Sequence, residues 1–545
     1  MQRHVLGRYF SPDDLVLLER VRGVAPPLPS LWRWLSHTAY FWVVGPWFGA
    51  NPLPYFLLNL ALHASSVALV YLVARRCHAS ILAATVAAAL FGASRLGFGA
   101  LAQAVGFDDL LALALSLTAC LAVASRRPII RTLGLVVFVG ALLAKESVML
   151  LPLAWLVVPM EEKLANRVRR WGPLLLAAVL WMAYLLGTNV RHSMLGGPAY
   201  RTGLGLGAIG RLLSYAQWSV DVWTRTPDYT GRPLEIHWAT GALVLAVWIS
   251  MAVWTWKRSK LVAFGLAWWL FGIIPVIPLI HQRNAYYVYE AWVGVGLALG
   301  GLFDAANARA RGPSDAPSSA RRTTSPRLRL LWGLAGVVVI THALISNLLL
   351  ERRVSENLPD VDLPDDALVR KQEVIRRVSD RVGAAFDHRR VRIVFYNPEV
   401  RGTSDFYSKL MSACLDEGRG LRALHPNVDS VAFLQQWLPA YADFDLVVAE
   451  EDGYVIPLGK GPEAHQRLLT VLLRNGFTEE ALRHATAATE AYPEDPGLAL
   501  AYATSLLANR DTTRAAAMLH QIEEHAPAQL AARARKMLGA IAAWR

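Results

Sequence analysis

Long apolar runs fill the first 350 residues of the chain and then stop. Several of them reach the roughly 20 residues that a helix needs to cross a bilayer. We predict an α-helical polytopic membrane domain over residues 1–350. Its spans are expected near 51–74, 79–98, 108–125, 128–144, 146–160, 171–187, 237–256, 261–280, 285–303 and 330–350.

The pattern beyond residue 350 is that of water-soluble structure. A helical period covers 366–387, and short apolar runs at 392–396, 445–451 and 454–458 predict buried strands. We therefore expect a small α/β module over 351–463, followed by a helical tail over 464–545.

The tail repeats with a period of 34 residues. Asn475 aligns with Asn509, Ala481 with Ala515, and Pro493 with Pro527. Paired helices at this period are typical of tetratricopeptide repeats, which stack into a surface that binds protein partners. A plain helical hairpin is the alternative.

The net charge of +13 follows from topology rather than from nucleic-acid binding. The short segments on one predicted side, which include a linker at 304–329, hold 18 Lys and Arg in 50 residues, against 13 in 120 on the other side. The basic side of a membrane protein faces the cytoplasm. This orientation predicts a multi-pass protein of a bacterial inner membrane, with residues 351–545 in the periplasm.

The same orientation places Asp13 outside, although only twelve residues precede it. Because these residues are too few and too charged to span a bilayer, we expect a first transmembrane helix upstream of Met1.

Two acidic pairs, Asp13-Asp14 and Asp108-Asp109, lie at the predicted outer ends of apolar runs. Ionised groups at membrane depth are costly and mark functional sites. Both pairs also stand at helix starts, where carboxylates serve as caps. The sequence alone leaves these two roles open for each pair.

Two further polar groups fall on the same predicted face. One is Lys145-Glu146, between two apolar runs. The other is the segment HQRNAYYVYE, which brings His281, Arg283, Tyr286 and Tyr287. Lys and Arg are the side chains that bind phosphate oxygens. The joint placement of these groups predicts a substrate site on the outer face.

Several stretches in order resemble the GT-C clan of membrane glycosyltransferases, in its protein O-mannosyltransferase-like branch with C-terminal tetratricopeptide repeats. They are NPLPYFLLNLALH, ALFGASRLG, FDDLLALALSL, LLAKESVMLLP and IHQRNAYYVYE. The resemblance covers about residues 8–303 and the repeat tail. The stretch ALFGASRLGFGALAQ departs from it, because it lacks the His-Pro and Glu of many relatives.

The resemblance implies transfer of a sugar from a polyprenyl-phosphate donor to an acceptor hydroxyl of a protein or glycolipid. It implies that Asp13, or Asp14, is the catalytic general base, and that Asp108 or Asp109 positions the acceptor or the donor. Lys145 and Arg283 would bind the donor phosphate.

No cofactor is predicted, and no His and carboxylate cluster has the spacing of a metal site, so a divalent metal finds no support in the sequence. Two other functions compete with the transferase. One is a non-catalytic membrane scaffold of an envelope-assembly complex, in which the acidic residues serve as caps. The other is a transporter of lipid-linked sugar.

Overall fold

The computed structural model describes residues 2–26, 30–158, 163–188, 202–220, 238–257, 259–280, 285–311, 326–358, 362–387, 389–396, 411–449 and 454–544. The chain forms two compact units. The first, called the helical unit here, comprises Met1–Arg8, Pro27–Asn357 and Pro364–Val369. The second, called the mixed unit, comprises Tyr9–Pro26, Leu358–Leu363 and Arg370–Arg545.

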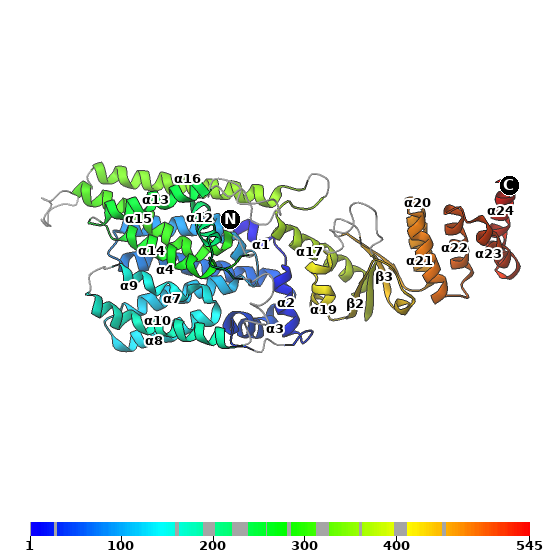
Figure 1. The fold of residues 1–545 in the computed structure, drawn as a ribbon, viewed down its shortest axis with the longest axis horizontal. Coiled ribbons are helices and arrows are strands. Elements are labelled where there is room, and N and C mark those ends of the chain that lie inside the picture. Colours follow the sequence, from blue (N-terminus) through cyan, green and yellow to red (C-terminus); the bar gives the residue numbers. More distant parts are fainter. Residues whose placement is uncertain are drawn as a thin grey trace. The chain divides into compact units, whose positions relative to one another are not determined.

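The helical unit contains helices that lie beside one another along most of their length (Figure 1). Its longer helices are α4 (Pro52–Arg76), α5 (Ile81–Ala93), α7 (Phe107–Val123), α8 (Pro128–Ala144), α10 (Leu164–Gly187), α12 (Gly207–Val220), α13 (Trp238–Thr255), α14 (Leu261–Ile273), α15 (Val288–Arg311) and α16 (Pro326–Ser355). Short elements join them: α1 (Gln2–Leu6), the π-helix η1 (Trp34–Ala39), α3 (Tyr40–Phe48), the 3₁₀-helices η2 (Arg95–Gly97), η3 (Glu146–Leu150), η5 (Ile274–Val276) and η6 (Ala285–Tyr287), α6 (Phe98–Leu101) and α9 (Pro152–Val157).

Four described helices are long and apolar enough to cross a membrane: α4, α10, α13 and α16. A fifth span results if α5 and the bent continuation through α6 count as one. The expectation of a helical membrane protein is thus met in this coarse form. The other expected spans coincide with shorter helices, except 285–303, which coincides with the 24-residue α15. The 17 residues of α7 or α8 reach about 25 Å, short of a hydrocarbon core of about 30 Å.

Helices α14 and α15 approach until their backbones touch. A Cβ atom on Gly265 would lie 2.4 Å from the carbonyl oxygen of Gly294, and one on Gly294 would lie 2.3 Å from that of Gly265. Small residues are the usual means of such close packing between helices in membranes. Side chains at these two positions would force the helices apart.

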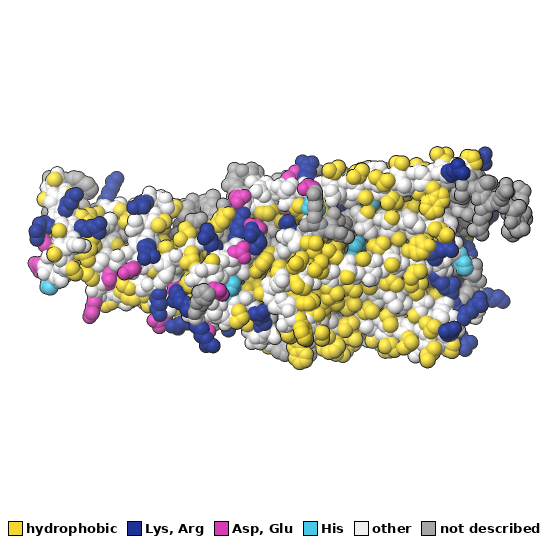
Figure 2. Space-filling model, turned by 180° about the vertical axis from the view of Figure 1, so that it is seen from behind, with side chains coloured by type: hydrophobic (Ala, Val, Ile, Leu, Met, Phe, Trp, Pro, Cys, Tyr) yellow, Lys and Arg dark blue, Asp and Glu magenta, His cyan; other side chains and the backbone are white. Residues whose placement is uncertain are grey.

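The two ends of the helical unit differ in chemistry. At one end, Arg76, the last residue of α4, donates to the carbonyl of Ala124 after α7 at 2.7 Å. Arg126 and Arg127 follow shortly after Ala124 in the chain. Asp304 of α15 accepts from the backbone of Ser80 there. Figure 2 shows Lys and Arg gathered at one end of this unit, beyond a broad apolar surface. The opposite ends of α7 and α15 carry the polar cluster described below.

The mixed unit is built on a four-stranded sheet of order β2-β1-β3-β4, formed by Val428–Leu434, Val391–Tyr396, Asp445–Ala449 and Val455–Gly459. Strand β1 pairs in parallel with β2 and β3, and β4 is antiparallel to β3. Helix α17 (Ala367–Phe386) precedes the sheet, and η7 (Asp416–Gly418), α19 (Arg419–Leu424) and η8 (Pro439–Tyr441) connect its strands.

The N-terminal helix α2 (Pro12–Val21) also belongs to the mixed unit, where it packs on α19. We expected it within a domain over 1–350. The helix buries Leu15, Leu17 and Leu18, and its packing on α19, far away in the sequence, explains the difference. A Cβ on Gly420 of α19 would come within 2.6 Å of Leu15 Cδ1.

Five helices end the chain: α20 (Pro462–Arg474), α21 (Thr478–Ala491), α22 (Pro496–Ala508), α23 (Thr512–His525) and α24 (Ala528–Trp544). Each packs on its neighbour in the chain, and α20 also packs on α22 and α22 on α24. This is a stack of helical hairpins. Its assignment to the tetratricopeptide class stays a prediction.

The three cysteines of the chain, Cys77, Cys120 and Cys414, are all buried and free. Burial raises the pKa of the Cys414 thiol to about 12. None of the three forms a disulfide.

Candidate functional site

A buried cluster of ionisable side chains lies where α7 begins and α8 ends. The ammonium nitrogen of Lys145 is 2.5 Å from Asp109 Oδ1 and 3.3 Å from Asp108 Oδ1. All three side chains are at most 7 % exposed. The expected pairs Asp108-Asp109 and Lys145-Glu146 therefore meet in one place.

Local backbone structure holds these groups. Asp108 and Asp109 lie in the first turn of α7, where carboxylates interact favourably with the helix dipole. Oδ1 of Asp108 accepts from the backbone N–H of Asp109 at 2.6 Å. Lys145 is extended, with φ −160°, and ends α8 directly before η3. After this break in the helix, Lys145 contacts the two carboxylates of α7.

Arg33 completes the cluster. Its Nη2 and Nε lie 2.7 Å and 3.1 Å from the two carboxylate oxygens of Glu146, and its Nη1 lies 3.0 Å from Asp108 Oδ2. The guanidinium also lies over the ring of Trp32, 4.5 Å from the ring centre. Bidentate pairs between an arginine and a carboxylate are among the strong hydrogen-bonded interactions of proteins.

The backbone around Arg33 is unusual. Its φ of 48° is left-handed, and it precedes the π-helix η1. Left-handed non-glycine residues cost of the order of 1 kcal/mol or more, and both features are enriched at functional sites. The surrounding contacts hold this strained conformation.

Further polar groups extend the cluster. Ser147 Oγ donates to Glu290 Oε1 of α15 at 2.8 Å, with both side chains buried. His37 Nε2 lies 3.6 Å from Asp108 Oδ2. Lys145 also faces the ring of Tyr286, at 5.8 Å from the ring centre.

Among the residues that the structure describes, carboxyl groups outnumber permanent cations in this cluster. Asp108, Asp109, Glu146 and Glu290 lie with Arg33 and Lys145, and His37 adjoins them. Buried ions are expensive and persist only when they are paired and hydrogen-bonded. The cluster is therefore a costly arrangement for an apolar helical unit, and such arrangements concentrate at functional sites.

Asp13 and Asp14 lie on α2, which belongs to the mixed unit, whereas the cluster residues belong to the helical unit. Asp14 is buried and completes a capping box: its Oδ2 accepts from the backbone N–H of Ser11 at 2.7 Å, and Ser11 Oγ accepts from the N–H of Asp14 at 3.4 Å. Asp13 is exposed. Of the two roles left open for this pair, capping belongs to Asp14.

The four residues expected from HQRNAYYVYE divide into two groups. His281 and Arg283 lie outside the described residues. Tyr286 faces Lys145, and its ring is 4.4 Å from that of Tyr287. Tyr287 packs against the apolar cluster that contains Trp269 and Trp292.

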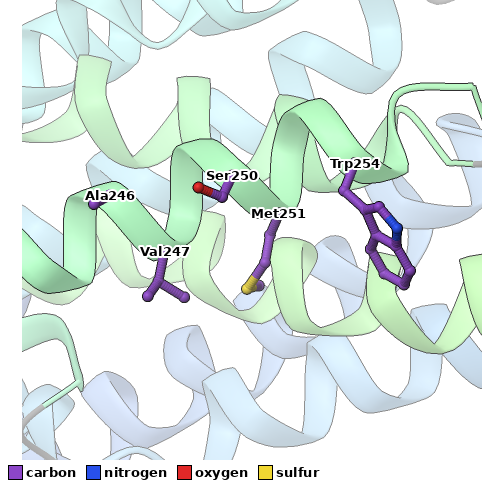
Figure 3. A pocket seen from close by; sticks show the side chains of 5 residues that line it. All are labelled: Ala246, Val247, Ser250, Met251 and Trp254. Atoms are coloured by element: carbon purple, nitrogen blue, oxygen red, sulfur yellow. The ribbon is translucent and has the colours of Figure 1, made fainter.

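No group of three or more His, Cys, Asp or Glu side chains in the described part of the chain has a geometry suited to a metal ion. A hollow of about 370 Å³ on α13 is lined by Ala246, Val247, Ser250, Met251 and Trp254 (Figure 3). Its lining has no titratable group, so it offers no chemistry of its own.

Comparisons with protein-family models, with curated proteins and with solved structures found no match.

Sequence reasoning missed Arg33, His37, Ser147 and Glu290. Arg33 lies within the aromatic stretch LWRWL, which indicates a membrane-interface segment rather than a site. Glu290 ends the quoted segment HQRNAYYVYE, and its acidic side chain at the start of an apolar run was a usable signal.

Proposed function

We propose that this protein is a membrane glycosyltransferase that moves a sugar from a polyprenyl-phosphate donor to an acceptor hydroxyl. One observation carries the proposal: a buried cluster of cations and carboxylates at one end of an apolar helical unit. A donor with a polyprenyl tail stays in the bilayer, so its phosphate must be met by groups held at the membrane.

The proposed reaction makes one bond and breaks one. The acceptor oxygen bonds to the anomeric carbon of the sugar while the bond from that carbon to the phosphate oxygen breaks. A carboxylate takes the hydroxyl proton, and the polyprenyl phosphate leaves as an anion. Lys145 and Arg33 are the cations of the cluster that stabilise this developing charge.

The resemblance to the GT-C clan assigns the general base to Asp13. Asp13 is exposed on α2 and Asp14 is engaged in the cap, which favours Asp13 over Asp14 for this role. We propose Asp13 as the general base independently of the phosphate-binding role of the cluster.

The distribution of charge supports an outward-facing site. Arg76, Arg126 and Arg127 lie at one end of α4 and α7, and Asp108 and Asp109 lie at the other end of α7. If the basic end faces the cytoplasm, as in most membrane proteins, the cluster faces outward. We propose the inner membrane of a bacterium, with the periplasm on the side of the cluster.

The stacked helices α20–α24 are proposed to recruit an acceptor or a partner protein, since such stacks present an extended binding surface. Deletion of 464–545 is expected to reduce partner binding. Unchanged partner capture and unchanged product would remove this part of the proposal.

The proposed activity is tested by mass spectrometry of envelope glycoproteins and glycolipids. Wild-type cells are compared with a deletion strain and with the deletion complemented by Lys145→Met or by the control Glu356→Gln, which changes an Arg-paired glutamate outside the cluster. A sugar missing in the deletion and in Lys145→Met, but present with the control, supports the transferase. An unchanged glycan inventory in the deletion strain favours the scaffold.

A further inference from the structure

The guanidinium of Arg33 makes a bidentate interaction with the carboxylate of Glu146. A phosphate group would suit the same two nitrogen atoms. Nη2 and Nε of Arg33 face the two oxygens of the Glu146 carboxylate at 2.7 Å and 3.1 Å. The guanidinium fork binds carboxylates and phosphates with the same parallel geometry. We propose that Glu146 is a placeholder, which holds the phosphate-binding edge of Arg33 until the donor phosphate displaces it.

Charge balance favours such an exchange. Among the residues that the structure describes, the cluster holds four carboxyl groups, Arg33, Lys145 and His37, and a phosphate brought into it adds negative charge. The phosphate can bind Arg33 only after a carboxylate has left or has taken up a proton, because like charges at short range repel strongly in a partly dry site.

Exposure identifies Glu146 as the group that leaves. Its side chain is 24 % exposed, whereas those of Asp108, Asp109 and Lys145 are 4 % to 7 % exposed. Of these side chains, Glu146 is therefore the one that can rotate away from Arg33 without displacing packed neighbours. Asp108 or Asp109 would have to move as an ion through packed side chains.

Arg33 keeps its position when Glu146 departs. Its Nη1 is held by Asp108 Oδ2 at 3.0 Å, and its guanidinium lies over Trp32. Its left-handed backbone, fixed before η1, sets the direction of the side chain. Nη2 and Nε then remain pointed at the vacated place, ready for two phosphate oxygens.

This inference rests on the proposed function, because it takes a lipid phosphate as the ligand. The first test uses the wild-type, full-length protein in detergent, labelled with a carbodiimide and an amine with and without geranyl phosphate. Mass spectrometry reads the modification of each carboxylate. We expect labelling of Glu146 to rise several-fold with geranyl phosphate, while Asp108 stays protected. Labelling of Glu146 that stays constant or falls overturns the exchange.

The second test measures the affinity for geranyl phosphate by calorimetry. Glu146→Gln removes the competing charge, so we expect binding about three- to tenfold tighter. Arg33→Gln should weaken binding at least tenfold, both alone and combined with Glu146→Gln. Arg33→Lys, which keeps the charge and loses the fork, should fall in between. Glu356→Gln makes the same charge change at the exposed pair with Arg352 and should leave affinity unchanged.

Ligand controls separate the sources of binding. Geraniol has the chain without the phosphate, and inorganic phosphate lacks the chain. Tighter binding of geranyl phosphate by Glu146→Gln, with no matching gain for geraniol, supports the exchange. Equal or weaker binding by Glu146→Gln contradicts it and leaves the transferase intact. A wild-type protein that does not bind geranyl phosphate overturns the exchange, and an unchanged glycan inventory in the deletion strain would then remove the transferase as well.

Discussion

Lys145 Nζ lies 2.5 Å from Asp109 Oδ1, and both side chains are buried in the helical unit. An isolated charge in such a place is far more costly than a paired one. Lys145 therefore has two roles: it stabilises the helical unit by pairing with Asp109, and we propose that it binds the donor phosphate. Substitutions can separate these two roles.

Lys145→Met leaves Asp109 without its cation and should lower the free energy of unfolding by about 3–5 kcal/mol. Adding Asp109→Asn should restore most of this stability, because the buried negative charge is gone. Sugar transfer should stay at least a hundredfold reduced in both variants. Thermal unfolding in detergent and product formation measure the two effects. A double variant that regains transfer along with stability would show that Lys145 acts only in folding.

Asp13→Asn tests the proposed general base. Asp13 is exposed, so the change should leave stability within about 0.5 kcal/mol, while transfer falls by about 10²–10⁴-fold. Asp14→Asn is the matched neighbour. It weakens the capping box with Ser11 and should cost about 1 kcal/mol, with transfer retained in the folded protein. Full transfer by Asp13→Asn would move the base elsewhere.

A backbone feature of the tail can be tested without any activity. Gly476 and Arg510, 34 residues apart, both have left-handed backbones, with φ of 78° and 63°, directly after Asn475 and Asn509. Arg510→Gly should stabilise the tail by up to about 1 kcal/mol, because glycine adopts this conformation without steric cost.

Gly476→Ala is the matched reverse change and should destabilise by a similar amount. No atom lies within 4 Å of the added Cβ, so only the backbone conformation opposes it. Hydrogen exchange of α20–α23 measures both variants. Opposite signs are expected, and a stabilising Gly476→Ala would show that this left-handed turn is not maintained in solution.

A buried histidine pair makes the mixed unit sensitive to acid. His465 Nδ1 and His484 Nε2 are 2.9 Å apart, near Trp437, Tyr396 and Tyr492. Burial lowers the pKa of His465 to about 4, and burial together with the nearby His465 lowers the pKa of His484 well below its usual value.

The unfolded chain, with histidine near pKa 6.5, therefore binds more protons than the folded one between about pH 6.5 and pH 4. The stability contribution is complete above about pH 6.5. It is lost as the pH falls toward 4, by an amount on the order of 3 kcal/mol for His465. Hydrogen exchange in α20 and α21, corrected for its intrinsic pH dependence, should show this loss. His484→Gln should flatten the profile and the exposed His520→Gln should not. Equal profiles for both variants would remove the pair as the cause.

The helices and strands that could be predicted from the sequence are those with a clear periodicity or length of their apolar pattern. Helix α17, strands β1, β3 and β4, and the helical hairpins of the tail all occur near the expected positions. Strand β2 and helix α12 were missed. The run VDSVAFL mixes small and polar residues with apolar ones, so its period is weak, and α12 lies in a stretch that reads as a long outer loop.

In the candidate site, too, some residues could be predicted from the sequence and others could not. The motifs around Asp108 and Lys145 stand out because charges interrupt apolar runs, and the structure brings them together. The partner Arg33 lies 75 residues before Asp108 in the chain, directly before the π-helix η1. No local sequence pattern indicates this arrangement. The placement of α2 in the mixed unit depends on contacts of Leu15 with Gly420, and such distant packing leaves no periodic trace.

The burial of Cys77, Cys120 and Cys414 has a practical consequence for mapping the protein. Thiol reagents that stay in water will find no native target on the folded chain, so a cysteine introduced at a loop or helix end becomes the sole label without prior removal of the others. Introduced beside Arg127 and beside Asp13 in turn, it reports from which side of the membrane each position is reached.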